Sequence, residues 1–186
     1  MSVVDAGWVR PKPGWACAEC GFDFDACAPI GISETMRGFA RRYRVPLTRG
    51  LPGEDLDALL RVRTPTGGWS ALEYACHARD AFMLSDYRIA KALIEDRPSF
   101  RVRDRDQVAI ERDYNGQEPA VVVDELAAAA DGLAARLASV PAEGWARVGI
   151  GQDFEMSVIW MARNAVHEGT HHLLDIARVL RVARGR

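Results

Sequence analysis

The sequence lacks any apolar run long enough to cross a membrane. A transmembrane helix needs about 20 mainly apolar residues, and the longest such stretches of this 186-residue chain are far shorter. The opening segment, MSVVDAGWVRPKPGW, also lacks the apolar core of a secretion signal. We therefore expect a cytoplasmic protein with no membrane partner.

The sequence also lacks a marked excess of either charge. Its 24 basic and 26 acidic residues leave a formal net charge of −2. A nucleic-acid-binding domain is usually strongly basic, so we expect no nucleic-acid partner. The apolar content of 48% is typical of a globular domain with a hydrophobic core.

Cysteine is scarce, with one residue each at 17, 20, 27 and 76. In a reducing compartment such cysteines are thiols or metal ligands more often than disulfides. Cys17 and Cys20 have the spacing of half a structural zinc site, or of a redox pair. Cys27 could add a third ligand, but the sequence offers no clear fourth. Ordinary side chains at a glycine-assisted turn remain an alternative, and we expect Cys76 to lie in the core.

Helical patterns dominate, and little of the chain resembles a strand. Ser70 and Glu73 form a capping-box sequence at the start of the clearest helix. Ser33 is the expected N-cap of an earlier helix, which Pro46 should help to end. The predicted long helices are 33–45, 70–95, 119–139 and 156–182, with a helical turn at 54–62, a long polar loop at 97–118 and a short hairpin within 141–154.

These elements predict an all-α protein built as a four-helix bundle. Residues 1–30 are rich in proline, glycine, cysteine and aromatic residues, and we expect them to form an irregular N-terminal arm. Residues 31–186 then form the bundle. The polar loop between the second and third long helices could shape a substrate pocket.

Histidine is equally scarce, yet three of the four histidines lie within NAVHEGTHHLLDI, residues 164–176. His167 and His171 are four residues apart, so they project side by side from a helix and could bind one metal ion. His77 is the only histidine elsewhere in the chain and is the candidate third ligand. His172 points about 100° away from His171 and is interpreted as a supporting or surface residue. The histidines could also simply lie on solvated helix faces.

The string HEGTH also matches the His-Glu-x-x-His motif of zinc peptidases, in which Glu168 would be the general base. The string is short and arises by chance. Gly169 disfavours a helix by about 1 kcal/mol relative to alanine. Asp175 is the only nearby downstream carboxylate, and it lies too close to His171 to match the usual third ligand. The peptidase is therefore the weakest of the alternatives.

Three segments resemble the DinB-like superfamily, which includes the mycothiol-dependent maleylpyruvate isomerases. They are WSALEYACHARD at 69–80, HEGTHHLLDI at 167–176, and the arm CAECGFD at 17–23, which is similar to the arm of some bacterial members. The resemblance implies a four-helix bundle that holds a divalent metal, zinc or nickel, through His77, His167 and His171.

The resemblance also implies a function. Several relatives use a low-molecular-weight thiol such as mycothiol or bacillithiol, whose thiolate the metal stabilises. We therefore expect a metal-dependent transferase or isomerase that acts on a small molecule. Asp80 and Glu168 are the candidate residues to orient the ligands. The alternative is a non-catalytic, stress-associated metal-binding bundle, which could form a homodimer.

Overall fold

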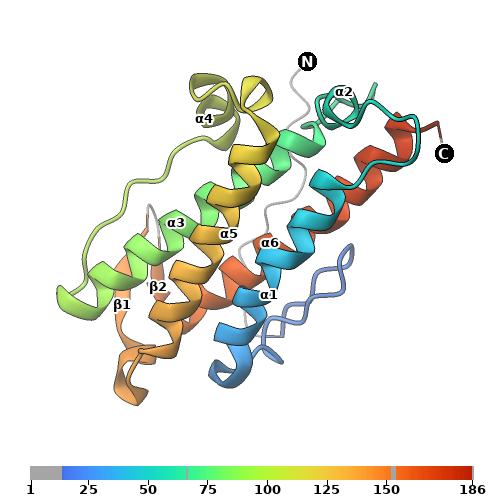
Figure 1. Cartoon of the computed structure of the whole chain (residues 1–186). Coiled ribbons are helices and arrows are strands. Elements are labelled where there is room, and N and C mark those ends of the chain that lie inside the picture. The colour runs from blue at the N-terminus through green and yellow to red at the C-terminus, as the bar shows by residue number, and fades with distance from the viewer. Residues whose placement is uncertain (1–13, 66, 152–153, 186) are drawn as a thin grey trace.

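Four long helices form the body of the molecule in the computed structural model, which describes residues 14–65, 67–151 and 154–185. They are α1 (Pro29–Thr48), α3 (Ala71–Ile94), α5 (Pro119–Ala138) and α6 (Val158–Ala183) (Figure 1). The all-α, four-helix prediction is confirmed. Within the described residues, no helix is both long and apolar enough to span a membrane.

The order of the helices around the bundle differs from their order in the chain. α1 packs against α5 and α6, and α3 packs against the same two helices from the other side. α1 and α6 run in one direction, whereas α3 and α5 run in the other (Figure 1). The chain must therefore return along the whole bundle between α3 and α5, which explains the length of that connection. The packing of α3 on α6 brings His77 of α3 next to His172 of α6.

Short elements fill the connections. The expected polar loop contains a helix, α4 (Arg105–Glu111), because the Asp104 carboxylate accepts a hydrogen bond from the Gln107 amide and caps it. A hairpin is present as the antiparallel strands β1 (Val148–Ile150) and β2 (Glu155–Ser157), but its second strand lies beyond the predicted range of 141–154. The remaining short elements are α2 (Leu56–Leu60) and the 3₁₀ helices η1 (Tyr114–Gly116) and η2 (Ala142–Ala146).

Two predictions about α1 are wrong. Ser33 does not cap the helix, because it is a residue of α1 itself. Its hydroxyl donates to the carbonyl of Ala134 on α5, at 2.8 Å. Pro46 does not end the helix, which continues to Thr48. A proline removes one backbone donor near the last turn, and burial of Leu47 in the core favours continuation. Tertiary contacts therefore override both local signals.

Of the two helices that carry the histidines, α3 begins as the sequence predicts, and α6 begins at Val158, two residues later than predicted. The Ser70 hydroxyl accepts from the Glu73 amide and the Glu73 carboxylate accepts from the Ser70 amide, which completes the capping box of α3. Ser157 caps α6 by accepting from the Trp160 amide at 3.2 Å. Both caps satisfy backbone donors that a helix start leaves unpaired. His77 and the HEGTHH segment thus lie on well-defined helices.

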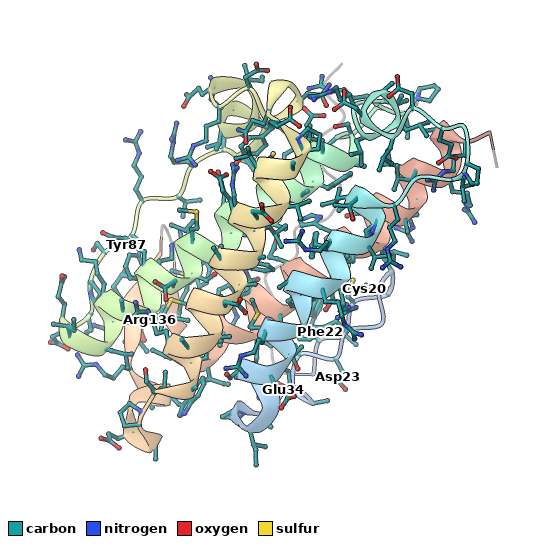
Figure 2. The ribbon with its side chains drawn as sticks, in the orientation of Figure 1. Cys20, Phe22, Asp23, Glu34, Tyr87 and Arg136 are labelled. Atoms are coloured by element: carbon teal, nitrogen blue, oxygen red, sulfur yellow. The ribbon has the colours of Figure 1, made fainter. Side chains whose placement is uncertain are left out.

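The N-terminal arm, described here as residues 14–28, contains no helix and lies beside the bundle, with Cys20, Phe22 and Asp23 following one another along it (Figure 2). Residues 1–13 of the predicted arm lie outside the described residues. The Arg163 guanidinium on α6 donates to the carbonyl of Cys27 at 2.8 Å and lies over the ring of Phe24. Arg178 on the same helix pairs with Glu19 at 2.6 Å. The arm is therefore attached mainly to α6.

Candidate metal centre

Helix α6 carries two ligand pairs, each four residues apart. His167 and His171 form one pair, and Glu168 and His172 form the other. Because successive helical residues are rotated by about 100°, the two pairs face different neighbours. The second pair faces α3 and the first pair faces the N-terminal arm. The segment HEGTHH therefore contributes to two clusters.

The first cluster, named here the His77 centre, consists of His77, Glu168 and His172. The Glu168 Oε2 atom lies 3.2 Å from His77 Nε2 and 3.1 Å from His172 Nε2. One ligand atom from each residue lies within 4.8 Å of the other two. Two imidazoles and a carboxylate that converge in this way form a set of three potential metal ligands.

Asp175 supports this centre from the next turn of α6. Its Oδ2 atom lies 2.9 Å from Nδ1 of His172. Such a carboxylate fixes the imidazole so that its Nε2 atom faces the site. Burial alone would lower the pKa of His172, but hydrogen bonds with Asp175 and Glu168 raise it to about 9.

The Glu168 carboxylate is ionised despite being buried. Burial alone would raise its pKa, but hydrogen bonds with His172 and His77 hold the pKa well below its usual range. An anionic oxygen between two imidazoles is the form that binds a cation. The two histidines compensate the buried charge, which would otherwise be costly.

Aromatic rings line the His77 centre. Trp69 packs on His77 with ring centroids 4.9 Å apart, and Tyr74 packs on His172 at 5.3 Å. The His77 side chain is 16% exposed, against 7% for His172. The centre is therefore largely shielded, and its more exposed edge is on the side of His77.

The second cluster, named here the Cys–His cluster, consists of Cys17, Cys20, His167 and His171. Cys17 Sγ lies 3.4 Å from Nδ1 of His171. Burial lowers the pKa of His167 to about 4 and raises the pKa of Cys20 to about 11. His167 is therefore neutral near pH 7, with a lone pair available.

The structure divides the three predicted metal ligands. His167 and His171 join the arm cysteines, whereas His77 joins Glu168 and His172. Among the described residues, no potential metal-binding group unites His77 with His167 and His171. The use of each residue as a metal ligand stays a prediction, but the grouping differs because the two faces of α6 meet different segments.

The two residues predicted to orient the metal ligands, Asp80 and Glu168, lie in different surroundings. Glu168 lies within the His77 centre itself. Among the described residues, the Asp80 carboxylate accepts hydrogen bonds from Arg79, Arg112 and the Tyr114 hydroxyl. Asp80 thus ties α3 to the α3–α5 connection.

Sequence reasoning missed two residues of the His77 centre. His172 points away from His171 as expected, but its interpretation as a surface residue is wrong because the residue is buried, with only 6% of its whole surface exposed. The sequence suggests a role for Asp175 only as a third ligand of a peptidase. The sequence does contain a signal for a second ligand pair, because Glu168 and His172 have the same i, i+4 spacing as His167 and His171. Only the tertiary structure shows that their partner on α3 is His77.

A separate cleft of about 820 Å³ opens between α3 and α5. Arg112 and Gln117 of the α3–α5 connection contribute to it, together with Arg79 and Asp80 of α3 and Glu125 of α5. Arg79 crosses it to pair with Glu125 at 2.6 Å. The histidine clusters are not part of this cleft.

Comparisons with known proteins agree with the four-helix bundle. A sequence model of the DinB superfamily matches residues 40–176, so the chain belongs to the DinB superfamily. YfiT from Bacillus subtilis has a similar structure, with a TM-score of 0.73 and 17% identity over 84% of this chain and 87% of that chain. That protein is described as a probable metal-dependent hydrolase with an unusual four-helix bundle topology. No curated protein matches this chain.

Proposed function

We propose that this protein is an enzyme dependent on a divalent metal, zinc or nickel, held by His77, Glu168 and His172. The observation that carries the proposal is the convergence of three ligand atoms, from two helices, in a largely shielded position. Two imidazoles and a carboxylate suit either ion and leave coordination positions for a small molecule. When bound, the metal would lower the pKa of a small nucleophile and polarise the substrate.

The residues of the chain hold and orient this donor set. Asp175 keeps the Nδ1 side of His172 occupied, so that the Nε2 atom remains directed at Glu168. Trp69 restricts the His77 ring and forms the apolar border of the site. The set differs from the expected one because Glu168 and His172 replace His167 and His171.

We propose further that the nucleophile is a small thiol, mycothiol or bacillithiol, in a transferase or isomerase reaction. The superfamily resemblance supports this choice. A supporting observation is that no cysteine of the described residues belongs to the His77 centre. The thiol of Cys76, on α3, is buried against Tyr114 of the α3–α5 connection, and burial raises its pKa to about 12. A reactive sulfur would therefore come from a bound molecule.

Hydrolysis is the second candidate. Two histidines and a glutamate are also the ligand set of several metal-dependent hydrolases. The description of YfiT as a probable metal-dependent hydrolase favours the same chemistry. The peptidase version of this idea is disfavoured, because Glu168 contacts His77 and His172, whereas His167 and His171 face the arm.

Metal content and activity test the proposal together. The protein is purified without a histidine tag, loaded with zinc or nickel, and compared with His77→Ala, Glu168→Gln and the exposed control Glu143→Gln. We expect the first two variants to bind one equivalent less metal than the wild type and the control. Equal metal in all four proteins would exclude the His77 centre.

Activity is measured on the same samples. Mycothiol or bacillithiol is mixed with monochlorobimane to follow conjugation, and p-nitrophenyl acetate reports hydrolysis. The thiol proposal predicts metal-dependent conjugation that Glu168→Gln abolishes and Glu143→Gln retains. Hydrolysis alone would favour the second candidate. Metal binding without either activity would favour a non-catalytic metal-binding bundle.

A further inference from the structure

We propose that Cys17, Cys20, His167 and His171 form a second, structural zinc site that fastens the N-terminal arm to α6. This site is independent of the His77 centre in its ligands and in its role. Two thiolates and two imidazoles form the donor set of closed tetrahedral zinc sites, which leave no position for a substrate.

The four ligand atoms already converge. One atom from each residue lies within 4.8 Å of the other three, although Cys17 and His171 are separated by 154 positions in the chain. The Cys17 Sγ atom lies 3.4 Å from Nδ1 of His171. The ring centroids of His167 and His171 are 5.3 Å apart. All four potential ligand atoms therefore lie close enough together to share one metal ion.

A second, independent observation is an unpaired nitrogen. The Nε2 atom of His167 is buried and has no hydrogen-bond partner among the described residues. Trp15 and Phe22 of the arm pack against this imidazole, with ring centroids 5.0 and 5.6 Å away. Buried polar atoms are nearly always paired in folded proteins. Coordination of a zinc ion by the Nε2 atom of His167 would explain this exception.

The arm is folded as a turn that presents both thiols. The Cys17 amide donates to the Phe22 carbonyl and the Gly21 amide donates to the Cys17 carbonyl, each at 2.9 Å. Gly21 has φ +71°, a conformation that glycine adopts without strain. The Cys-x-x-Cys-Gly sequence therefore forms a tight turn that holds both cysteines near each other, as a zinc-binding turn does.

The arm has little regular structure of its own. Its described residues, 14–28, form no helix, and their only ladder-type pairing is an isolated bridge between Ala16 and Asp23. Its outer ion pair, Arg178 with Glu19, is exposed and contributes little. Metal coordination would supply the order that so short a segment cannot obtain from its own core.

The test uses the full chain with the His77 centre removed, so that one site remains. In a His77→Ala background, zinc content and zinc X-ray absorption are measured for the parent, for Cys20→Ser and for the control Cys27→Ser. Cys27 is half-buried in the same arm but lies outside the cluster. We expect one zinc with two sulfur neighbours at about 2.3 Å, lost in Cys20→Ser and kept in Cys27→Ser.

Two measurements keep the test decisive if Cys20→Ser folds poorly. Titration of the wild-type protein with a mercurial should release one zinc as the arm thiols react, detected by a chromophoric chelator. Hydrogen exchange at the amides of Cys17, Gly21 and Phe24 should accelerate when zinc is removed, whereas helix α5 keeps its protection.

Three results would overturn the proposal. The first is zinc bound only by nitrogen and oxygen, as expected if Glu19, His171 and Asp175 were the ligands. The second is a Cys17–Cys20 disulfide in protein purified anaerobically, which would indicate a redox pair. The third is no bound metal after loading with zinc. None of these results affects the test of the His77 centre, because His77→Ala and Cys20→Ser are expected to remove two different metal ions.

Discussion

Single residues at the junction of α1, α3 and α6 control how closely the helices approach. A Cβ atom at Gly169 would lie 2.7 Å from the ring of Phe39 and 2.9 Å from that of Phe82. The Tyr43 hydroxyl also donates to the Gly169 carbonyl at 2.9 Å. Gly169, which disfavours a helix by propensity, is therefore required for packing, and it lies in the segment of α6 that carries both ligand pairs.

Gly169→Ala should destabilise the protein by about 1–3 kcal/mol, because the added methyl group overpacks the core. The matched control is Gly132→Ala in α5, where a Cβ would meet nothing within 4 Å. That change should stabilise by about 0.5–1 kcal/mol through helix propensity. Urea unfolding of both variants measures the difference, and equal effects at the two sites would contradict the packing explanation.

Cys76 should be inert to alkylation in the native protein. Burial raises the pKa of its thiol to about 12, so only about 1 in 10,000 molecules carries the thiolate at pH 8. Mass spectrometry after treatment with iodoacetamide at pH 8 should find Cys76 unmodified, with full labelling after denaturation. Labelling of native Cys76 at the denatured rate would show that α3 is not packed as described.

At the scale of elements, the start of α3 sets the position of His77. The capping box at Ser70 and Glu73 is buried, and the Ser70 hydroxyl also donates to Asn115 Oδ1 at 2.6 Å. The same serine therefore caps the helix and joins it to the α3–α5 connection. His77 lies two turns further along α3.

Ser70→Ala should lower the free energy of unfolding by about 1–2 kcal/mol, the usual effect of losing a buried cap. The control is Asp104→Ala, which removes the N-cap of the short, peripheral helix α4 and should change global stability by less than about 0.5 kcal/mol. Thermal or urea unfolding monitored by circular dichroism gives both values. A larger effect at Asp104 than at Ser70 would contradict the assigned roles.

At the scale of the whole molecule, Asp175 connects the two proposed metal sites. Its Oδ2 atom lies 2.9 Å from His172 Nδ1 and 3.6 Å from His171 Nε2. One carboxylate thus faces an imidazole from each cluster. The N-terminal arm, α6 and α3 are linked through this one turn of helix.

Asp175→Asn should weaken zinc binding at the His77 centre by about 10- to 100-fold, the usual effect of losing a carboxylate behind a metal-binding histidine. A smaller loss is expected at the Cys–His cluster, since the contact with His171 exceeds hydrogen-bond length. Competition titrations in the Cys20→Ser and His77→Ala backgrounds measure the two sites separately, with the exposed Asp131→Asn as the control. Unchanged affinity at the His77 centre would contradict the supporting role.

Much of the fold was predictable because its signals are local. The sequence predicts the capping box of α3, which is present, and a hairpin before α6, whose first strand lies in the predicted segment. Ser33 and Pro46 misled because burial against α5 and the core outweighed their local preferences.

The candidate site was predictable only in its parts. The sequence by itself determined the i, i+4 pairs of α6, the Cys-x-x-Cys turn of the arm and the presence of one histidine on α3. Helical spacing fixes the directions of side chains relative to one another on one helix. It does not fix the rotation of that helix against its neighbours. Only the tertiary structure decided that α3 covers the face of Glu168 and His172 and that the arm covers the face of His167 and His171.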